Sequence, residues 1–248
     1  MAILAANWKM HKTIAEAEAW LSVVGRSPRL RQAQVLLFPP LTALHALRGR
    51  EPSIALGAQD VGWAAEGAYT GMVSAAQLRD AGCSHALVAH SERRRYACED
   101  DLRAARKIAA LWQAGLTPVY CVGEDAAERT AGLGPARLRA QVDTVLEALG
   151  GALGGALVIA YEPIWAIGSG TPATPAEAAE AAALIRGRVE AHCGATSAHQ
   201  LSLLYGGSAS AASAGGFLAE AALDGLLVGS ASLDPGSFLA MLEVVADA

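Results

Sequence analysis

Eight short apolar runs recur along the chain, and their regular spacing constrains the fold more than any other feature of the sequence. Each run is continuously apolar and does not alternate with polar residues, as expected for strands that are buried on both faces of a parallel sheet. The runs are AILAA at 2, QVLLF at 34, IALGA at 54, HALVA at 85, TPVYCV at 117, ALVIAY at 156, LSLLY at 201 and GLLVG at 225. They predict eight parallel strands.

Segments with helical character separate these runs, among them 16–24, 75–82, 100–115 and 135–150, and several end in glycine, the usual left-handed cap. Eight strand–helix units without a linker favour a single α/β domain over residues 1–248, the closed (β/α)8 barrel. An open, doubly wound sheet has the same periodicity, so the apolar pattern alone does not exclude it. A chain of 248 residues buries enough surface for either fold without disulfides or a structural metal.

Charge and cysteine content narrow the functional classes. A net charge of -5 provides no general attraction for nucleic acid, so an anionic ligand needs a local site. The four cysteines, Cys83, Cys98, Cys121 and Cys193, have neither C-x-x-C nor metal-ligand spacing, which is typical of free thiols in a reducing compartment. The start MAILAANWK does not resemble a signal peptide, and no apolar stretch is long enough for a membrane span. We expect a soluble, cytoplasmic protein without nucleic-acid, membrane or metal partners.

Polar residues and glycines follow the predicted strands at their carboxyl ends. In either α/β architecture these ends form the active-site face, so residues far apart in the sequence are expected to converge in space. In chain order they are Asn7, Lys9, Gln59, His90, Glu92, Cys121, Glu124, Glu162, Ser208, Gly229 and Ser230.

Three of these residues have the chemistry of a proton-transfer site. The ammonium group of Lys9 can hold a phosphate or a developing oxyanion, although a solvated loop lysine is the simpler alternative. His90 precedes a short helix whose N-terminal potential favours a neutral ring that donates to a carbonyl. Glu162 precedes the apolar segment 163–167, whose cover would desolvate the carboxylate and raise its basicity. A histidine satisfied by backbone groups and an acid paired with an arginine remain alternatives.

The segment GSGTPA at 168–173 fits the spacing of a dinucleotide-binding turn. Such a turn opens directly into a helix, whereas the capping box TPAE at 174–177 places the next helix start only at Pro175. The glycines therefore belong to a loop over 163–173, which is longer than ordinary connections between strand and helix. We interpret this loop as a cover over Glu162.

Two further glycine-rich turns, YGGSAS at 205–210 and LVGSAS at 227–232, follow the last two predicted strands. Backbone amides exposed in such turns bind anions. Each turn alone is also compatible with an ordinary connection, but (β/α)8 barrels commonly build a phosphate site from these two loops together. The pair therefore predicts a phosphate site.

The ordered motifs NWKMHKT, GAYTG, AHSERRRY, CVGE, YEPIWAIGSGTPA, LLYGGS and LVGSASL resemble those of the triosephosphate isomerase family over nearly the whole chain. The resemblance implies a single-domain (β/α)8 TIM barrel and an isomerase of glycolysis and gluconeogenesis. The implied reaction interconverts dihydroxyacetone phosphate and D-glyceraldehyde 3-phosphate through an enediol(ate), without a cofactor or metal. The tuning of a glutamate and a neutral histidine beneath a closing loop is a well-known illustration from this family.

The resemblance also implies roles for individual residues. Glu162 would be the base that moves a proton between C1 and C2, His90 the neutral electrophile, and Lys9 a stabiliser of negative charge. Asn7 would help to position the substrate, and Glu92 and Cys121 would support the site. The implied phosphate ligands, acting mainly through backbone amides, are Gly168, Ser208, Gly229 and Ser230.

Members of the family are typically homodimers in which the loop after strand three inserts beside the partner's catalytic lysine and histidine. The implied dimerisation loop is 63–72, with Tyr69 and Thr70 at its tip. The implied active-site lid is 163–173, whose closure would exclude water and retain the intermediate.

Five residues depart from the family pattern. Met72 stands where a glutamate usually pairs with the neighbour's arginine equivalent to Arg93, so the usual interface ion pair is not expected. Ser230 replaces a usual glycine, which predicts a less permissive backbone at one phosphate-binding amide. In the lid, Ser169 replaces a threonine, and TPA at 171–173 replaces the commoner KTA. Pro172 is expected to stiffen the hinge.

Two other functional classes fit a barrel with a phosphate site. A Schiff-base aldolase needs a lysine near the end of an inner strand. The sixth predicted strand carries Glu162 at this position and no lysine, which argues against an aldolase. A non-enzymatic phosphosugar-binding module would not need Asn7, Lys9, His90 and Glu162 together. The isomerase is therefore the preferred hypothesis.

Overall fold

Eight parallel strands close into a barrel in the computed structural model, which describes residues 1–167 and 172–248. Each strand pairs with the next, and β8 pairs with β1, so the two edge strands of an open sheet do not exist here. The strands start and end within about two residues of the predicted bounds. They are β1 (Ile3–Asn7), β2 (Gln34–Phe38), β3 (Ile54–Ala58), β4 (Cys83–Val88), β5 (Thr117–Val122), β6 (Val158–Tyr161), β7 (Ser202–Tyr205) and β8 (Gly225–Val228).

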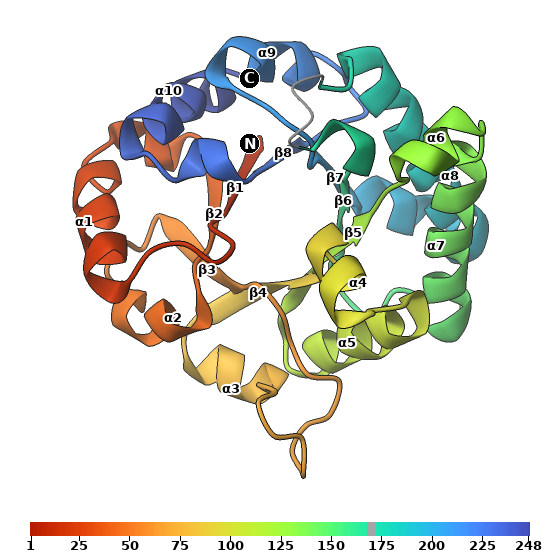
Figure 1. Cartoon of the computed structure of the whole chain (residues 1–248), viewed down its shortest axis with the longest axis horizontal. Helices are drawn as coiled ribbons and strands as arrows, with labels where there is room; N and C mark the ends of the chain where they lie inside the picture. The colour runs from red at the N-terminus through yellow and green to blue at the C-terminus, as the bar shows by residue number, and fades with distance from the viewer. Residues whose placement is uncertain (168–171) are drawn as a thin grey trace.

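Helices surround the barrel as an outer ring (Figure 1). They are α1 (Ile14–Val24), α2 (Leu41–Leu47), α3 (Ala75–Asp80), α4 (Ser91–Ala97), α5 (Asp101–Gln113), α6 (Ala126–Thr130), α7 (Gly134–Ala148), α8 (Pro175–Gln200), α9 (Ala211–Leu218) and α10 (Pro235–Ala246). Within the two described ranges, none of the helices is both long and apolar enough to cross a membrane.

The start of α8 agrees with the capping box in the sequence. Thr174 Oγ1 accepts the backbone N–H of Glu177 at 3.2 Å, and Glu177 Oε2 accepts the backbone N–H of Thr174 at 2.8 Å. Pro175 occupies the first turn, where its missing N–H has no intrahelical partner to lose. The helix therefore begins too late for a dinucleotide-binding turn at 168–173.

Strand side chains are buried in two layers, which explains why the runs are continuously apolar. Alternate residues point into the barrel, and the others pack against the surrounding helices. A Cβ on Gly57 would lie 2.3 Å from Phe38 Cε1, so this inner position requires glycine. The inner core consists of Ile3, Ala5, Leu36, Phe38, Leu87, Val119, Cys121, Val158, Ala160, Leu204 and Leu227.

The connection after β3 extends beyond the ring of helices, at the bottom of Figure 1. Within it, the rings of Trp63 and Tyr69 meet edge to face with their centroids 5.7 Å apart, which gives the loop a small core of its own. Tyr69 and Met72 nevertheless remain exposed, at 43% and 38%. This loop therefore presents large apolar side chains on its outer surface.

Candidate active site

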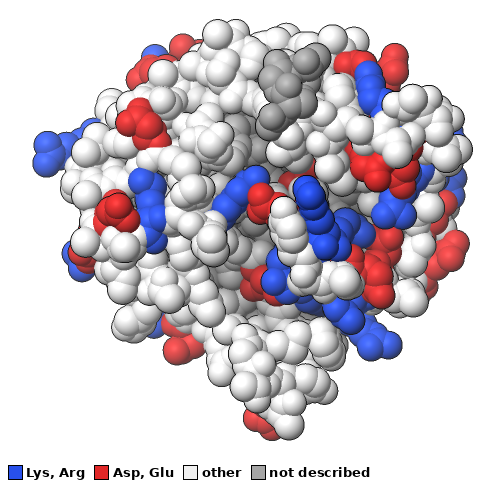
Figure 2. Space-filling view, in the orientation of Figure 1, with Lys and Arg blue, Asp and Glu red and all other residues white. Residues whose placement is uncertain are grey.

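The carboxyl ends of the strands surround a cavity of about 340 Å³ at the mouth of the barrel. Figure 2 shows the corresponding face, which is hollowed near its centre and carries both acidic and basic side chains at the rim. The structure thus brings together residues from both ends and the middle of the chain. The predicted site residues that line the cavity are Asn7, Lys9, His90, Glu162, Ser208, Gly229 and Ser230.

Glu162 and His90 form a buried pair in this cavity. His90 Nε2 lies 2.9 Å from Glu162 Oε1, and the two residues are only 5% and 2% exposed. The second carboxylate oxygen accepts the backbone N–H of Ser91 at 2.9 Å. The backbone N–H of Glu92 donates to His90 Nδ1 at 3.2 Å, which places the proton of the neutral ring on Nε2. The imidazole therefore directs an N–H donor at the carboxylate.

Burial and pairing act in opposite directions on the pKa of each partner. Burial raises the pKa of Glu162, but the charge and hydrogen bond of His90, together with the Ser91 N–H, lower it below its ordinary value. Burial likewise lowers the pKa of His90, whereas the Glu162 carboxylate raises it above its ordinary value. In this arrangement the direct contact therefore lowers the pKa of Glu162 and raises that of His90, the opposite of the directions that burial and the helix N-terminus alone would give.

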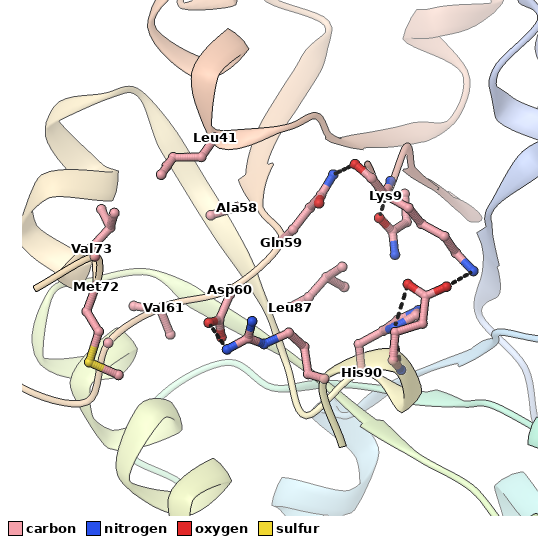
Figure 3. Close-up of a pocket in the computed structure, with 15 residues that line it drawn as sticks. Lys9, Leu41, Ala58, Gln59, Asp60, Val61, Met72, Val73, Leu87 and His90 are labelled. Atoms are coloured by element: carbon pink, nitrogen blue, oxygen red, sulfur yellow. Dashed lines mark hydrogen bonds and ion pairs between the residues drawn. The ribbon is translucent and has the colours of Figure 1, made fainter. Parts of the chain in front are cut away.

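Lys9 leaves β1 in a left-handed conformation with φ of 52°, which is uncommon for a residue with a side chain. Two side chains hold this turn: Asn7 Oδ1 accepts the Lys9 N–H at 2.9 Å, and Gln59 Nε2 donates to the Lys9 carbonyl at 2.7 Å (Figure 3). Lys9 Nζ forms an ion pair with Glu92 Oε1 at 2.8 Å. The sequence indicates Gln59 only as a polar residue after β3, and its hydrogen bond to Lys9 could not be predicted from that position.

Cys121 lies inside the barrel and is fully buried. Burial, followed by the nearby Glu162 carboxylate, raises the pKa of the thiol well above its ordinary value. A buried, protonated thiol is unreactive, so Cys121 contributes by packing beneath the site and not by nucleophilic chemistry.

The turns after β7 and β8 present backbone, and not charged side chains, to the cavity. A Cβ on Gly207 would lie 2.2 Å from Tyr205 Oη, a distance that real structures do not tolerate. One on Gly229 would lie 3.3 Å from Lys9 Cε. Both positions therefore keep space open at the edge of the cavity.

Two serines complete these turns. Ser208 Oγ donates to the carbonyl of Ala166 at 3.0 Å and so joins the turn after β7 to the segment after β6. Ser230 begins a short 3-10 turn, and its φ is not positive. The backbone of Ser230 therefore has a conformation that serine adopts without strain, and the effect of the serine on phosphate binding stays a prediction. Gly168 and Ser169 lie outside the described residues, and Pro172 is exposed.

The segment that follows β6 is anchored where it begins. Glu124 Oε1 accepts the hydroxyl of Tyr161 at 2.9 Å and the indole N–H of Trp165 at 2.7 Å. The Trp165 ring also lies 3.6 Å from the Arg129 guanidinium. Glu124 is thus a candidate for anchoring the segment after β6, a role that the sequence does not indicate beyond an acid after β5.

A second cavity of about 340 Å³ adjoins the first and shares part of its lining (Figure 3). Leu41, Met72 and Val73 form an apolar part of its wall. Arg93, which also lines it, forms an ion pair with Asp60 of the same chain at 2.7 Å. Arg93 therefore has an acidic partner, Asp60, within the same chain, although position 72 carries a methionine in place of the family's usual glutamate.

The closed barrel, the acid–base pair and the glycine-rich turns define a class, the (β/α)8-barrel enzymes with their site at the carboxyl ends of the strands. Across the described ranges, no cluster of three or more His, Cys, Asp or Glu side chains is arranged to hold a metal ion.

Comparison with known proteins identifies the family within this class. A family model described as triosephosphate isomerase matches residues 2–245. Proteins named triosephosphate isomerase from Halorhodospira halophila, Rubrobacter xylanophilus and Xanthomonas axonopodis pv. citri are 44%, 43% and 45% identical to the chain. These matches cover 99%, 97% and 98% of this chain and 98%, 96% and 98% of the relatives. The chain belongs to the triosephosphate isomerase family.

Proposed function

We propose that this chain interconverts dihydroxyacetone phosphate and D-glyceraldehyde 3-phosphate, an isomerisation of glycolysis and gluconeogenesis. The observation that carries the proposal is the buried pair of Glu162 and His90, which faces the same small cavity as Lys9. A proton transfer next to a carbonyl needs a base, an electrophile and electrostatic stabilisation. These side chains supply all three without a cofactor or metal.

Glu162 is the base in this proposal. Substrate enters between Glu162 and His90 and replaces their contact, so that burial then dominates and raises the pKa of the carboxylate. The carboxylate takes a proton from C1 of dihydroxyacetone phosphate, and the electrons of the C–H bond form the C1–C2 double bond of the enediolate. His90 Nε2–H donates to the C2 oxygen. Return of the proton to C2, with a proton moved between the two oxygens through His90, gives D-glyceraldehyde 3-phosphate.

Lys9 and Asn7 provide the electrostatic and positioning parts of the proposal. The Lys9 ammonium stabilises the negative charge that develops on the enediolate oxygens. Asn7 positions the substrate, and its hydrogen bond to the Lys9 N–H also fixes the turn that carries the ammonium. Glu92, through its ion pair with Lys9, and Cys121, through packing, are supporting residues.

The phosphate group is held at the opposite side of the cavity, mainly by the backbone amides of Gly168, Ser208, Gly229 and Ser230. Residues 163–173 form the lid, which closes over the substrate, excludes water and retains the enediol so that it does not lose phosphate. The contacts of Glu124 with Trp165, and of Ser208 with Ala166, support this assignment because they anchor the first part of the segment.

We further infer a cytoplasmic homodimer of one domain per chain, residues 1–248. The loop 63–72 inserts into the second cavity of the partner, beside its Lys9 and His90. The exposed Tyr69 and Met72 and the apolar wall of that cavity support this arrangement. Light scattering of the purified protein is expected to give twice the chain mass of 25.4 kDa. A monomer at micromolar concentration would contradict the dimer.

The function is tested by assaying purified protein with dihydroxyacetone phosphate, beside the variant Glu162→Gln. We expect the wild type to isomerise the substrate and to exchange the C1 proton with solvent. Loss of the base should lower kcat by about 10²–10⁴-fold while KM changes little. Binding without proton exchange would instead favour a phosphosugar-binding module, and borohydride trapping of a substrate adduct would favour an aldolase.

A further inference from the structure

Ala89, the residue between β4 and His90, has a left-handed backbone conformation with φ of 57°. This conformation brings Cβ close to the carbonyl oxygen, so it is disfavoured for alanine, which has no side-chain oxygen for a local hydrogen bond. Ala89 is buried, with 1% exposure, at the point where the chain turns from β4 into α4. Its φ and ψ therefore determine the direction in which His90 leaves the strand.

Two charged side chains hold the peptide groups on either side of the Ala89 Cα. Glu99 Oε1 accepts the Ala89 N–H at 3.0 Å, and Arg94 Nε donates to the Ala89 carbonyl at 2.9 Å. The first bond fixes the peptide plane before Cα and the second fixes the plane after it. Because φ and ψ describe the relation between these two planes, the two bonds together define the backbone conformation of Ala89. Charge-assisted hydrogen bonds are strong enough to stabilise a disfavoured conformation.

Glu99 is itself fixed by a buried ion pair. Its side chain and that of Lys107 are each 1% exposed, and Lys107 Nζ lies 2.7 Å from Glu99 Oε2. Lys107 also pairs with Asp60. An ion pair that only stabilised the fold would need no contact with the backbone beside His90. Here one carboxylate oxygen faces the lysine, and the other binds the N–H of Ala89.

We propose that Glu99 is a positioning residue for the isomerisation. Together with Arg94 it holds Ala89 in the left-handed conformation, and this conformation directs His90 Nε2 toward Glu162 and the substrate carbonyl. The inference rests on the electrophilic role proposed for His90. Glu99 thus influences turnover indirectly, because it fixes the backbone conformation of Ala89 and through it the orientation of His90.

The substitution Ala89→Gly separates this role from a purely structural one, because glycine adopts the left-handed conformation without penalty. We expect Glu99→Gln to lower kcat about tenfold, equal to about 1.4 kcal/mol in the barrier, while KM changes less than about twofold. When Ala89 is already glycine, the same substitution is expected to lower kcat less than about threefold, because the strain that Glu99 offsets is gone.

Asp143→Asn is a matched control. Asp143 on α7 pairs with Arg188 at 2.7 Å and contacts His192, in a cluster between α7 and α8. Its loss is expected to affect stability but to leave kcat unchanged in either background. Wild-type kcat in Glu99→Gln would overturn the proposal, as would an equal loss of kcat with alanine and with glycine at position 89.

If Glu99→Gln does not fold, Arg94→Lys tests the second hydrogen bond to Ala89. Lysine retains a positive charge beside Asp101 but cannot reproduce the fixed fork of the guanidinium. We expect a lower kcat that Ala89→Gly restores, and no restoration would overturn the proposal. A wild-type enzyme without isomerase activity would contradict the proposed function itself, so the two failures are distinguishable.

Discussion

The mouth of the barrel has two halves that differ in what they present to the cavity. The half at β1, β4 and β6 presents the side chains of Lys9, His90 and Glu162, each held by a further hydrogen bond or ion pair. The half at β7 and β8 presents backbone, with glycine at position 207, where a Cβ would collide with the Tyr205 hydroxyl, and at position 229, where a Cβ would lie 3.3 Å from Lys9 Cε. The side-chain half is therefore expected to lose function when atoms are removed, and the backbone half when atoms are added.

The largest effect in the following set is expected for Lys9→Met, which removes the ammonium group but keeps most of the side-chain volume. Loss of one preorganised group that stabilises an oxyanion lowers kcat/KM by about 10²–10³-fold. Steady-state kinetics measure the loss. Lys12→Met is the matched control, because Lys12 packs over the Trp8 ring, and it should remain within about twofold of wild type. A loss below tenfold for Lys9→Met would show that removal of atoms is tolerated in this half.

The addition of one methyl group in the backbone half, Gly207→Ala, is expected to raise KM about tenfold with a smaller change in kcat. The new Cβ would require the Tyr205 hydroxyl to move, and overpacking of this kind costs about 1–3 kcal/mol. Inhibition by inorganic phosphate should weaken in parallel, since the displaced turn is assigned to the phosphate. An unchanged inhibition constant would separate this turn from phosphate binding.

The pKa shifts of the pair predict a pH-dependent difference in stability between the wild type and Glu162→Gln. The raised pKa of His90 contributes stability that is fully present below about pH 6.5 and is lost as the pH rises through the folded value. The lowered pKa of Glu162 contributes stability that is present above about pH 4.3 and is lost on acidification.

The advantage of the wild type should therefore be largest between about pH 4.3 and 6.5 and decline on both sides, by at most about 1.4 kcal/mol per pH unit for each group. Urea unfolding at a series of pH values measures this difference. A difference that stays constant from pH 4 to 9 would contradict the direct pairing of the two groups.

The smallest effect is expected for Ser230→Gly. Because φ of Ser230 is not positive, the extra conformational freedom of glycine is not needed at this position. We expect kcat and KM to stay within about twofold of wild type. An improvement of KM well beyond this range would show that the serine does restrict the phosphate turn.

The sequence predicts the strands and the start of α8 well, because both depend on local physics. Burial on both faces leaves continuously apolar runs, and a capping box involves residues three positions apart. The residues at the mouth were predictable for a related reason, since the carboxyl ends of all parallel strands meet at one face. Their roles in the reaction stay predictions.

The electrostatic state of the site was not predictable in the same way. The contact between His90 and Glu162 joins β4 to β6, and no pattern within either segment indicates that the two side chains meet at 2.9 Å. The surroundings of each residue considered alone therefore predicted a raised pKa for Glu162 and a neutral His90, whereas the contact lowers the pKa of Glu162 and raises that of His90. The same applies to Ala89, whose left-handed conformation depends on a distant acid and not on its own residue type.

The pairing of β8 with β1 has a consequence for how activity arises during synthesis. Lys9 follows the first strand and Gly229 the last, yet a Cβ on Gly229 would lie 3.3 Å from Lys9 Cε. A nascent chain on the ribosome therefore has no complete cavity until β8 has emerged and closed the ring. A fragment that ends before β8 should be inert even where its units have folded, and a peptide that supplies the missing strand and helix should restore turnover in trans.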